Sequence, residues 1–163
     1  PGACVMIKPQ SIQNEYSLIF SGDPALSLPE DPEERTRVLR IAQQTGNWTA
    51  LVVPGQVPTV FHFRNLEHSD IAWLDGEHQL STEHGRPLGN IEYLTLAVRL
   101  ALRSVDNFGT HKVEHKQLGS QRKVATAAIV NAIHAAAGKL GPELLTEFAV
   151  HIINRGSGQL DPL

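Results

Sequence analysis

The sequence predicts an α+β fold, in which a small antiparallel sheet with hairpins packs against three to four α-helices behind an extended N-terminal arm. Three observations predict this class. Apolar residues recur at helical spacing in residues 32–45, 90–105 and 142–156. Residues 58–64 alternate between apolar and polar side chains, as a strand with one buried face does. The first 30 residues combine short β-prone runs with proline and glycine, which is typical of extended chain.

The chain length of 163 residues fits one domain, and a hydrophobic content of 41% provides for a sizeable core. We expect an extended arm at residues 1–30, a single α+β domain at residues 31–156 and a C-terminal tail at residues 157–163. Within the arm, residues 5–7 and 16–20 are β-prone. The arm is expected to pack on a neighbouring subunit rather than on its own core.

The clearest local signal is a helix over residues 32–45. Asp31 can cap the first amides, Pro32 suits the first helical position, and Glu34 stands three residues after the cap. Gly46 is placed to end the helix, because glycine tolerates the left-handed conformation found at helix C-termini.

Two strands are expected next, at residues 51–53 and 58–64, with a turn between them. In the second strand Thr59, Phe61 and Phe63 share one face. One face of this strand is therefore expected to pack on a core.

Residues 67–74 are expected to form a short helix, and the polar, glycine- and histidine-rich residues 75–89 a mobile loop. A longer helix follows over residues 90–105. Its buried stripe is expected to hold four apolar side chains, Leu94, Ala97, Val98 and Ala101. Residues 110–124 are expected to form a hairpin that turns at Gly119 and Ser120.

Two helices close the chain, over residues 125–137 and 142–156. The last helix carries Phe148 and Ile152 on one stripe. An amphipathic helix and a half-apolar strand each need a partner layer, so this stripe and Phe61 are expected to share one core.

Composition argues against several classes of protein. The formal net charge is −3, whereas dedicated nucleic-acid-binding domains are usually strongly basic, so nucleic acid is not the expected partner. No apolar run approaches the roughly 20 residues that span a bilayer, and no membrane contact is expected. The single cysteine, Cys4, excludes an internal disulfide. The first residues lack a basic segment followed by an apolar one, so we expect synthesis in the cytosol.

Signatures of catalysis are missing from the sequence. It contains neither the GxSxG nucleophile elbow nor the phosphate-binding patterns GxxxxGK[ST] and GxGxxG. We therefore expect a non-enzymatic protein, with no catalytic residue and no cofactor.

The first alternative is a metal-dependent enzyme built from residues 62–84. Imidazole and carboxylate are the ligands of catalytic zinc and of non-haem iron, and four histidines lie there near four carboxylates. Their spacing does not place two ligands on adjacent turns of one helix, so no metal is assigned. The weak candidates are His62, His68, His78 and His84.

Glu143, Glu147 and His151 recur every four residues in the last helix, and we interpret this column as its solvated side.

Opposite charges gather in two parts of the chain. Acidic residues dominate residues 23–34, and basic residues dominate residues 111–123. This asymmetry suits head-to-tail contact between copies, and contact of the basic hairpin with nucleic-acid phosphates is the second alternative. The residues expected to bind partners are Asp23, Leu26, Leu28, Glu33, Lys112, Lys116, Arg122 and Lys123.

Three segments resemble small proteins from the structural modules of tailed bacteriophages, tail-assembly chaperones and minor virion proteins in particular. They are residues 21–26 (SGDPAL), 54–66 (PGQVPTVFHFRNL) and 142–145 (PELL). The resemblance implies a virion structural or tail-assembly protein that binds copies of itself and other virion or assembly proteins. It implies a location in the cytoplasm of the bacterial host during assembly, or in the virion. It transfers no catalytic residues.

Overall fold

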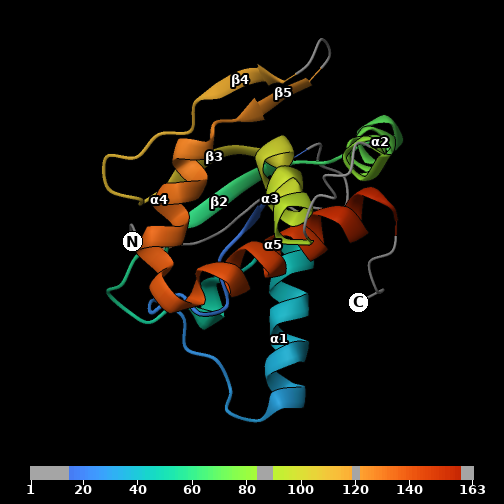
Figure 1. The fold of residues 1–163 in the computed structure, drawn as a ribbon. Helices are drawn as coiled ribbons and strands as arrows, with labels where there is room; N and C mark the ends of the chain where they lie inside the picture. Colours follow the sequence, from blue (N-terminus) through green and yellow to red (C-terminus); the bar gives the residue numbers. More distant parts are fainter. Residues whose placement is uncertain (1–14, 84–89, 119–121, 159–163) are drawn as a thin grey trace.

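Three strands form the central antiparallel sheet of an α+β fold, in the order β1 (Glu15–Leu18), β2 (Val60–Arg64) and β3 (Leu102–Asp106) (Figure 1). This computed structural model describes residues 15–83, 90–118 and 122–158, with the backbone alone described at residues 78–83 and 90. Within these ranges, no helix is both long enough and apolar enough to cross a membrane.

One face of the sheet packs on the C-terminal helix α5 (Gly141–Gly156). The ring of Phe148 meets the rings of Phe61 and Phe63 edge-on, at centroid distances of 4.8 and 5.4 Å. Ile152, one turn further along α5, is fully buried in the same cluster. The predicted common core of the Phe61 strand and the last helix is therefore confirmed.

Three further elements cover α5 and the sheet. The helices α3 (Asn90–Ala101) and α4 (Ala127–Ala137) both pack against α5. A hairpin of β4 (His115–Leu118) and β5 (Arg122–Ala125) contacts α3 and β3 through its second strand. The predicted pairing of a hairpin is thereby confirmed, although residues 110–114 lie outside both strands. The predicted turn at Gly119 and Ser120 lies outside the described residues.

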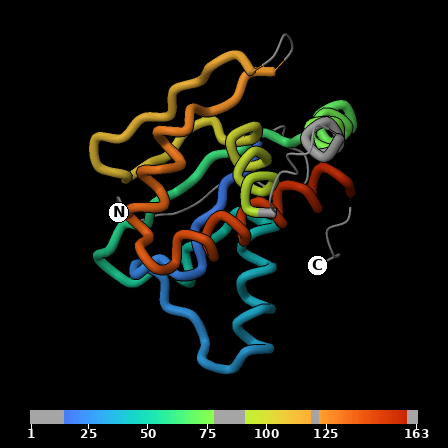
Figure 2. The backbone as a smooth tube through the Cα atoms, viewed as in Figure 1, coloured from blue at the N-terminus to red at the C-terminus, as the bar shows by residue number. Residues whose placement is uncertain are grey.

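The helix α1 (Pro32–Thr45) has the bounds that the sequence predicted. The Oδ2 atom of Asp31 accepts the amide of Glu34 at 3.0 Å, and Gly46 ends the helix at φ 75°. Figure 2 shows that its N-terminal part extends away from the rest of the chain. Ala42 is the one buried residue of this helix.

The predicted strand at residues 51–53 is wrong. A short 3-10 helix, η2 (Thr49–Leu51), occupies its start, and Val52 forms only an isolated bridge with Leu26. Pro24 and Pro54 lie opposite each other at one end of this antiparallel bridge, and η2 lies at the other end. Because proline has no backbone amide to donate, the ladder does not extend past the two prolines.

The predicted loop at residues 75–89 is wrong for its first part, because α2 (His68–Glu83) continues through residue 83. A bond between neighbouring helices supports this extension: the Tyr93 hydroxyl of α3 donates to Asp75 at 2.9 Å. The polar composition suggested a loop, although a helix on the outside of a domain can be polar on most of its surface. Residues 84–89 lie outside the described residues.

The helix predicted to run to residue 105 ends at Ala101, and β3 follows it without a connecting loop. Pairing with β2 explains why residues 102–106 form a strand and not the end of the predicted helix. Phe61 lies opposite Val105, and His62 lies opposite Ser104, so β3 supplies hydrogen bonds that one edge of β2 would otherwise lack.

The arm does not pack as predicted within its described part. β1 pairs with β2, and the side chains of residues 16–20 are all buried in the chain's own core. A strand with apolar side chains and an available sheet edge beside it is stabilised by that edge, whether or not a neighbouring subunit is present. Residues 1–14 and 159–163, which include the rest of the arm and most of the predicted tail, lie outside the described residues.

Candidate functional site

An acidic surface, which we call the acidic end, lies at the start of α1. Glu30, Asp31 and Glu33 are exposed there. Glu34 accepts two hydrogen bonds from Arg37, and this interaction holds the pKa of the Glu34 carboxyl below its usual value. The acidic end therefore presents its charge largely through Glu30 and Glu33, because Asp31 is engaged as the helix cap.

Three other residues predicted to bind partners have neighbours within the chain. The carboxylate of Asp23 accepts the amides of Ala25 at 2.8 Å and Thr59 at 3.0 Å. Leu26 is half-buried and forms the bridge with Val52, and Leu28 is also half-buried. These three residues are thus less exposed than Glu30, Asp31 and Glu33.

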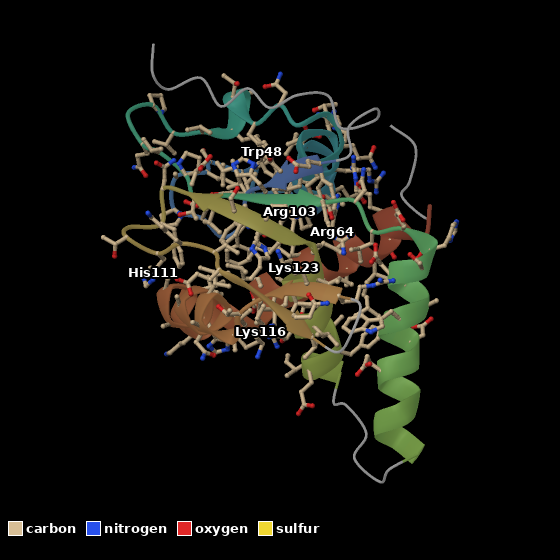
Figure 3. The ribbon with its side chains drawn as sticks, turned by 90° about the horizontal axis from the view of Figure 1, so that it is seen from above. Trp48, Arg64, Arg103, His111, Lys116 and Lys123 are labelled. Atoms are coloured by element: carbon tan, nitrogen blue, oxygen red, sulfur yellow. The ribbon has the colours of Figure 1, made fainter. Side chains whose placement is uncertain are left out.

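A basic surface, which we call the basic end, lies on and beside the hairpin. Lys112, Lys116 and Lys123 are exposed. In Figure 3, Lys116 and Lys123 lie on the hairpin, His111 lies beside it, and Arg103 lies on β3. The sequence-based reasoning missed Arg103, because it assigned this position to a helix.

The lysines of the hairpin do not share one face. Lys116 lies opposite Val124 and Gln117 lies opposite Lys123 in the ladder. Residues directly opposite each other point to the same face and successive residues to opposite faces, so the two lysines project in different directions. The basic end therefore carries a lysine on each face of the hairpin, rather than both on one flat surface.

Arg122 serves to hold the hairpin against α2. Its Nε atom lies 3.3 Å from the carboxylate of Asp70, and its Nη2 atom donates to the carbonyl of Ser69 at 3.2 Å. Arg64 donates to both oxygens of the same carboxylate, at 2.8 and 3.2 Å. Burial opposes ionisation of Asp70, but the bonds from Arg64 and from the Glu67 amide outweigh it and lower the pKa. Asp70 is thus a structural counter-ion that links three elements.

His62 joins a serine and an aspartate across the sheet. Its Nδ1 atom lies 2.6 Å from the Ser17 hydroxyl, and its Nε2 atom lies 2.7 Å from the carboxylate of Asp106. The residue types are those of a catalytic triad, but the exposures are reversed: Ser17 is 4% exposed, whereas the Asp106 side chain is 62% exposed. A nucleophile must be reached by its substrate. We therefore interpret this chain of hydrogen bonds as a polar link between the three strands.

Of the other histidines in the metal hypothesis, the structure describes the side chain of His68 alone. His68 is exposed at the start of α2, the side chain of His78 is not described, and His84 lies outside the described residues. In the part of the chain that the structure describes, no group of three or more potential ligands could hold a metal ion.

A groove of about 440 Å³ runs between α1 and α5. Leu39, Arg40 and Gln43 line it from α1, and Glu147, Val150 and His151 line it from α5. The sequence-based interpretation of Glu147 and His151 as a solvated column is wrong. His151 is 8% exposed and packs on the ring of Tyr16, and Glu147 accepts both the amide and the hydroxyl of Ser21.

Burial changes the acid–base behaviour of both residues. It raises the pKa of Glu147, against the opposing effect of the Ser21 bonds. Burial, aided by the nearby charge of Arg155, lowers the pKa of His151 to about 4. The imidazole is therefore neutral at pH 7, and its Nε2 atom has no hydrogen-bond partner among the described residues.

Comparison with known proteins identifies no relative of this chain. No protein-family model, no curated protein and no solved structure matches it.

Proposed function

We propose that this chain is a non-enzymatic assembly protein that binds further copies of itself head to tail, through its acidic and basic ends. The resemblance of three segments to proteins of tailed bacteriophages supports a virion structural or tail-assembly role with other virion proteins as further partners. The host-cell cytoplasm during assembly, or the virion, is the corresponding location.

The separation of opposite charges carries this proposal. The start of α1 lies at one end of the molecule and the β4–β5 hairpin at the other, as Figure 1 shows. Surfaces of opposite charge attract, and surfaces that differ on the two partners form an open chain unless the rotation between copies closes it into a ring. Each copy therefore offers one end to its predecessor and the other to its successor.

The projecting helix provides further support. Ile41 is 40% exposed on α1, and Val38 and Leu39 are half-buried. A helix that uses little of its apolar stripe within its own domain has surface left for a partner. The acidic end stands on this helix, so a bound copy can reach both the charges and the apolar side chains.

Charge reversal at each end tests the proposal. Glu30→Lys with Glu33→Lys makes both ends basic, and Lys116→Glu with Lys123→Glu makes both ends acidic. Light scattering at about 0.05 M salt, where screening is weak, should show a wild-type mass that keeps rising with concentration and no such rise for either variant alone. An equimolar mixture of the two variants should associate again, because each end then meets its opposite.

The control changes the net charge by the same amount as Glu30→Lys with Glu33→Lys, but at other positions. Glu67→Lys with Glu92→Lys alters two exposed glutamates outside both ends, and this variant should associate like the wild type. A wild-type protein that stays monomeric at millimolar concentration, or a mixture that remains monomeric, contradicts head-to-tail contact. If the Lys116 variant instead associates normally but loses salt-dependent binding to DNA or RNA, the basic end is a nucleic-acid contact.

A further inference from the structure

The groove between α1 and α5 has polar walls. Leu39 and Val150 are apolar, but the other eight of the ten described residues that line it are polar or charged. On each helix the lining residues are spaced three or four apart, so each wall is one continuous helix face. The volume of about 440 Å³ lies within the range of about 300–1,000 Å³ that is common for small-molecule sites. The groove therefore has the size of a ligand site and a lining that can hydrogen-bond.

The imidazole of His151 forms the floor of this groove. The residue lines the groove although it is only 8% exposed, and its Nε2 atom is buried without a hydrogen-bond partner among the described residues. A buried polar atom that lacks a partner is unfavourable, so a ligand group that bonds to it is stabilised. The pKa of about 4 keeps the imidazole uncharged at pH 7, where either tautomer offers one donor and one acceptor nitrogen. The floor therefore suits an uncharged polar group.

Primary amides lie on both walls of the groove. Gln43 of α1 and Asn154 of α5 line it, and both are half-buried. A primary amide carries donors and an acceptor side by side, so it can bond both the carbonyl and the N–H of a peptide group. Leu39 and Val150, one on each wall, add apolar surface for an aliphatic group. The walls thus complement the two parts of a residue in a peptide, its amide group and its side chain.

The charged residues of the lining favour an uncharged ligand. Arg40 on α1 and Glu147 on α5 have formal charges that cancel, so a cation or an anion in the groove meets a like charge as well as an opposite one. Both carboxylate oxygens of Glu147 already accept hydrogen bonds from Ser21. Because an ion is unfavourable in a partly buried site without a dedicated counter-ion, an uncharged molecule suits the groove better.

We propose that the groove between α1 and α5 binds a small uncharged molecule that carries a peptide-like amide group and a branched aliphatic side chain. Gln43, Asn154 and His151 hydrogen-bond to the amide groups of this ligand, and Leu39 and Val150 pack against its side chain. The site goes beyond the self-association proposed above and does not depend on it, because the described residues that line the groove include none of the charged residues that define the acidic and basic ends.

Titration with N-acetyl-leucine N-methylamide, which has peptide groups on both sides of a leucine side chain and no charge, tests the site. NMR spectra of the isotope-labelled chain are recorded at about 0.5 M salt, where the ionic contact between copies is screened. The side-chain signals of Gln43, Asn154 and His151 should shift and saturate with a Kd on the order of 1 mM. Gln43→Ala and Asn154→Ala should each raise that Kd about fivefold, because each removes a hydrogen-bonding partner of the ligand. Both variants should fold, since alanine is the most favourable helical residue.

The matched control is Gln117→Ala, which removes an exposed glutamine from β4 and should bind the ligand like the wild type. Free leucine has the same side chain but is charged at both ends, and it should bind at least about tenfold more weakly. Shifts that do not saturate, or a wild-type Kd in Gln43→Ala and Asn154→Ala, overturn the site, and equal binding of free leucine overturns its preference for an uncharged ligand. These outcomes leave the charge-reversal test at low salt unaffected, so failure of the ligand site and failure of the head-to-tail contact are distinguishable.

Discussion

Polar side chains in α5 show how burial on folding changes the acid–base properties of a single residue. His151 stands four residues from Glu147, and polar residues with this spacing are also typical of the solvent-exposed side of a helix. Packing of α5 on β1 instead places the imidazole against Tyr16, with the Arg155 guanidinium 4.3 Å from the Tyr16 ring centre. Burial also raises the pKa of the Tyr16 hydroxyl, which has no hydrogen-bond partner among the described residues.

The low pKa of His151 predicts a specific loss of stability in acid. Its pKa is about 4 in the folded chain and 6.5 in a model compound, so the unfolded chain binds more protons between these values. The free energy of unfolding should therefore fall as the pH drops from 6.5 towards 4, by on the order of 3 kcal/mol from this residue. Urea denaturation at several pH values measures this loss.

The comparison variant for this prediction is His151→Leu, which should lose less stability than the wild type over the same pH range. His68→Leu changes an exposed histidine and should keep the wild-type pH dependence. Identical pH dependence in the wild type and His151→Leu would show that folding does not lower the pKa of this imidazole.

At the scale of the element, α1 and α5 have the same amphipathic pattern but different surroundings. α5 is buried along the stripe that holds Phe148 and Ile152, whereas α1 buries only Ala42. Most helical stability in proteins comes from packing of the apolar face. The ends of α1 thus depend on local capping to a greater degree than those of α5.

Hydrogen exchange should show this difference. At low protein concentration and about 0.5 M salt, where copies are separated, the amides of α1 should exchange faster than those of α5. Asp31→Ala should speed exchange in α1 by a further factor of about five, because an N-cap contributes about 1 kcal/mol. Thr126→Ala is the matched control, since Thr126 stands at the N-cap of α4 without a side-chain bond. Equal protection of α1 and α5 would contradict this account.

At the scale of the whole molecule, the acidic and basic ends lie far apart, at opposite ends of the chain's fold. A contact between the acidic end of one copy and the basic end of another should weaken with salt, because ionic attraction is screened within a few ångströms at high salt.

Salt should therefore change the size of the assembly. At about 0.05 M salt the mass should rise with concentration, and at about 0.5 M salt this rise should be lost. Light scattering across a salt series on one protein preparation measures this. A mass that does not respond to salt would argue against the ionic contact.

Several features depend only on residues that are close together in the sequence, and the sequence alone therefore predicts them. Asp31, Pro32 and Gly46 act within one turn of the ends of α1, so the bounds of that helix follow from them. The alternation around Phe61 and the stripe around Phe148 likewise predict which faces are buried, and the α+β class follows from these patterns.

Long-range contacts decided the rest. Leu102–Asp106 is a strand because β2 offers it an edge, and the helical pattern before it contains no signal of that partner. Arg122 is a structural residue because Asp70, distant in sequence, lies beside it, and His151 is neutral because Tyr16 and the sheet exclude water from it. Strand pairing, ion pairing and desolvation depend on neighbours that only the folded chain brings together. The charges at the two ends could be read from the sequence, but their separation in space is a property of the tertiary structure.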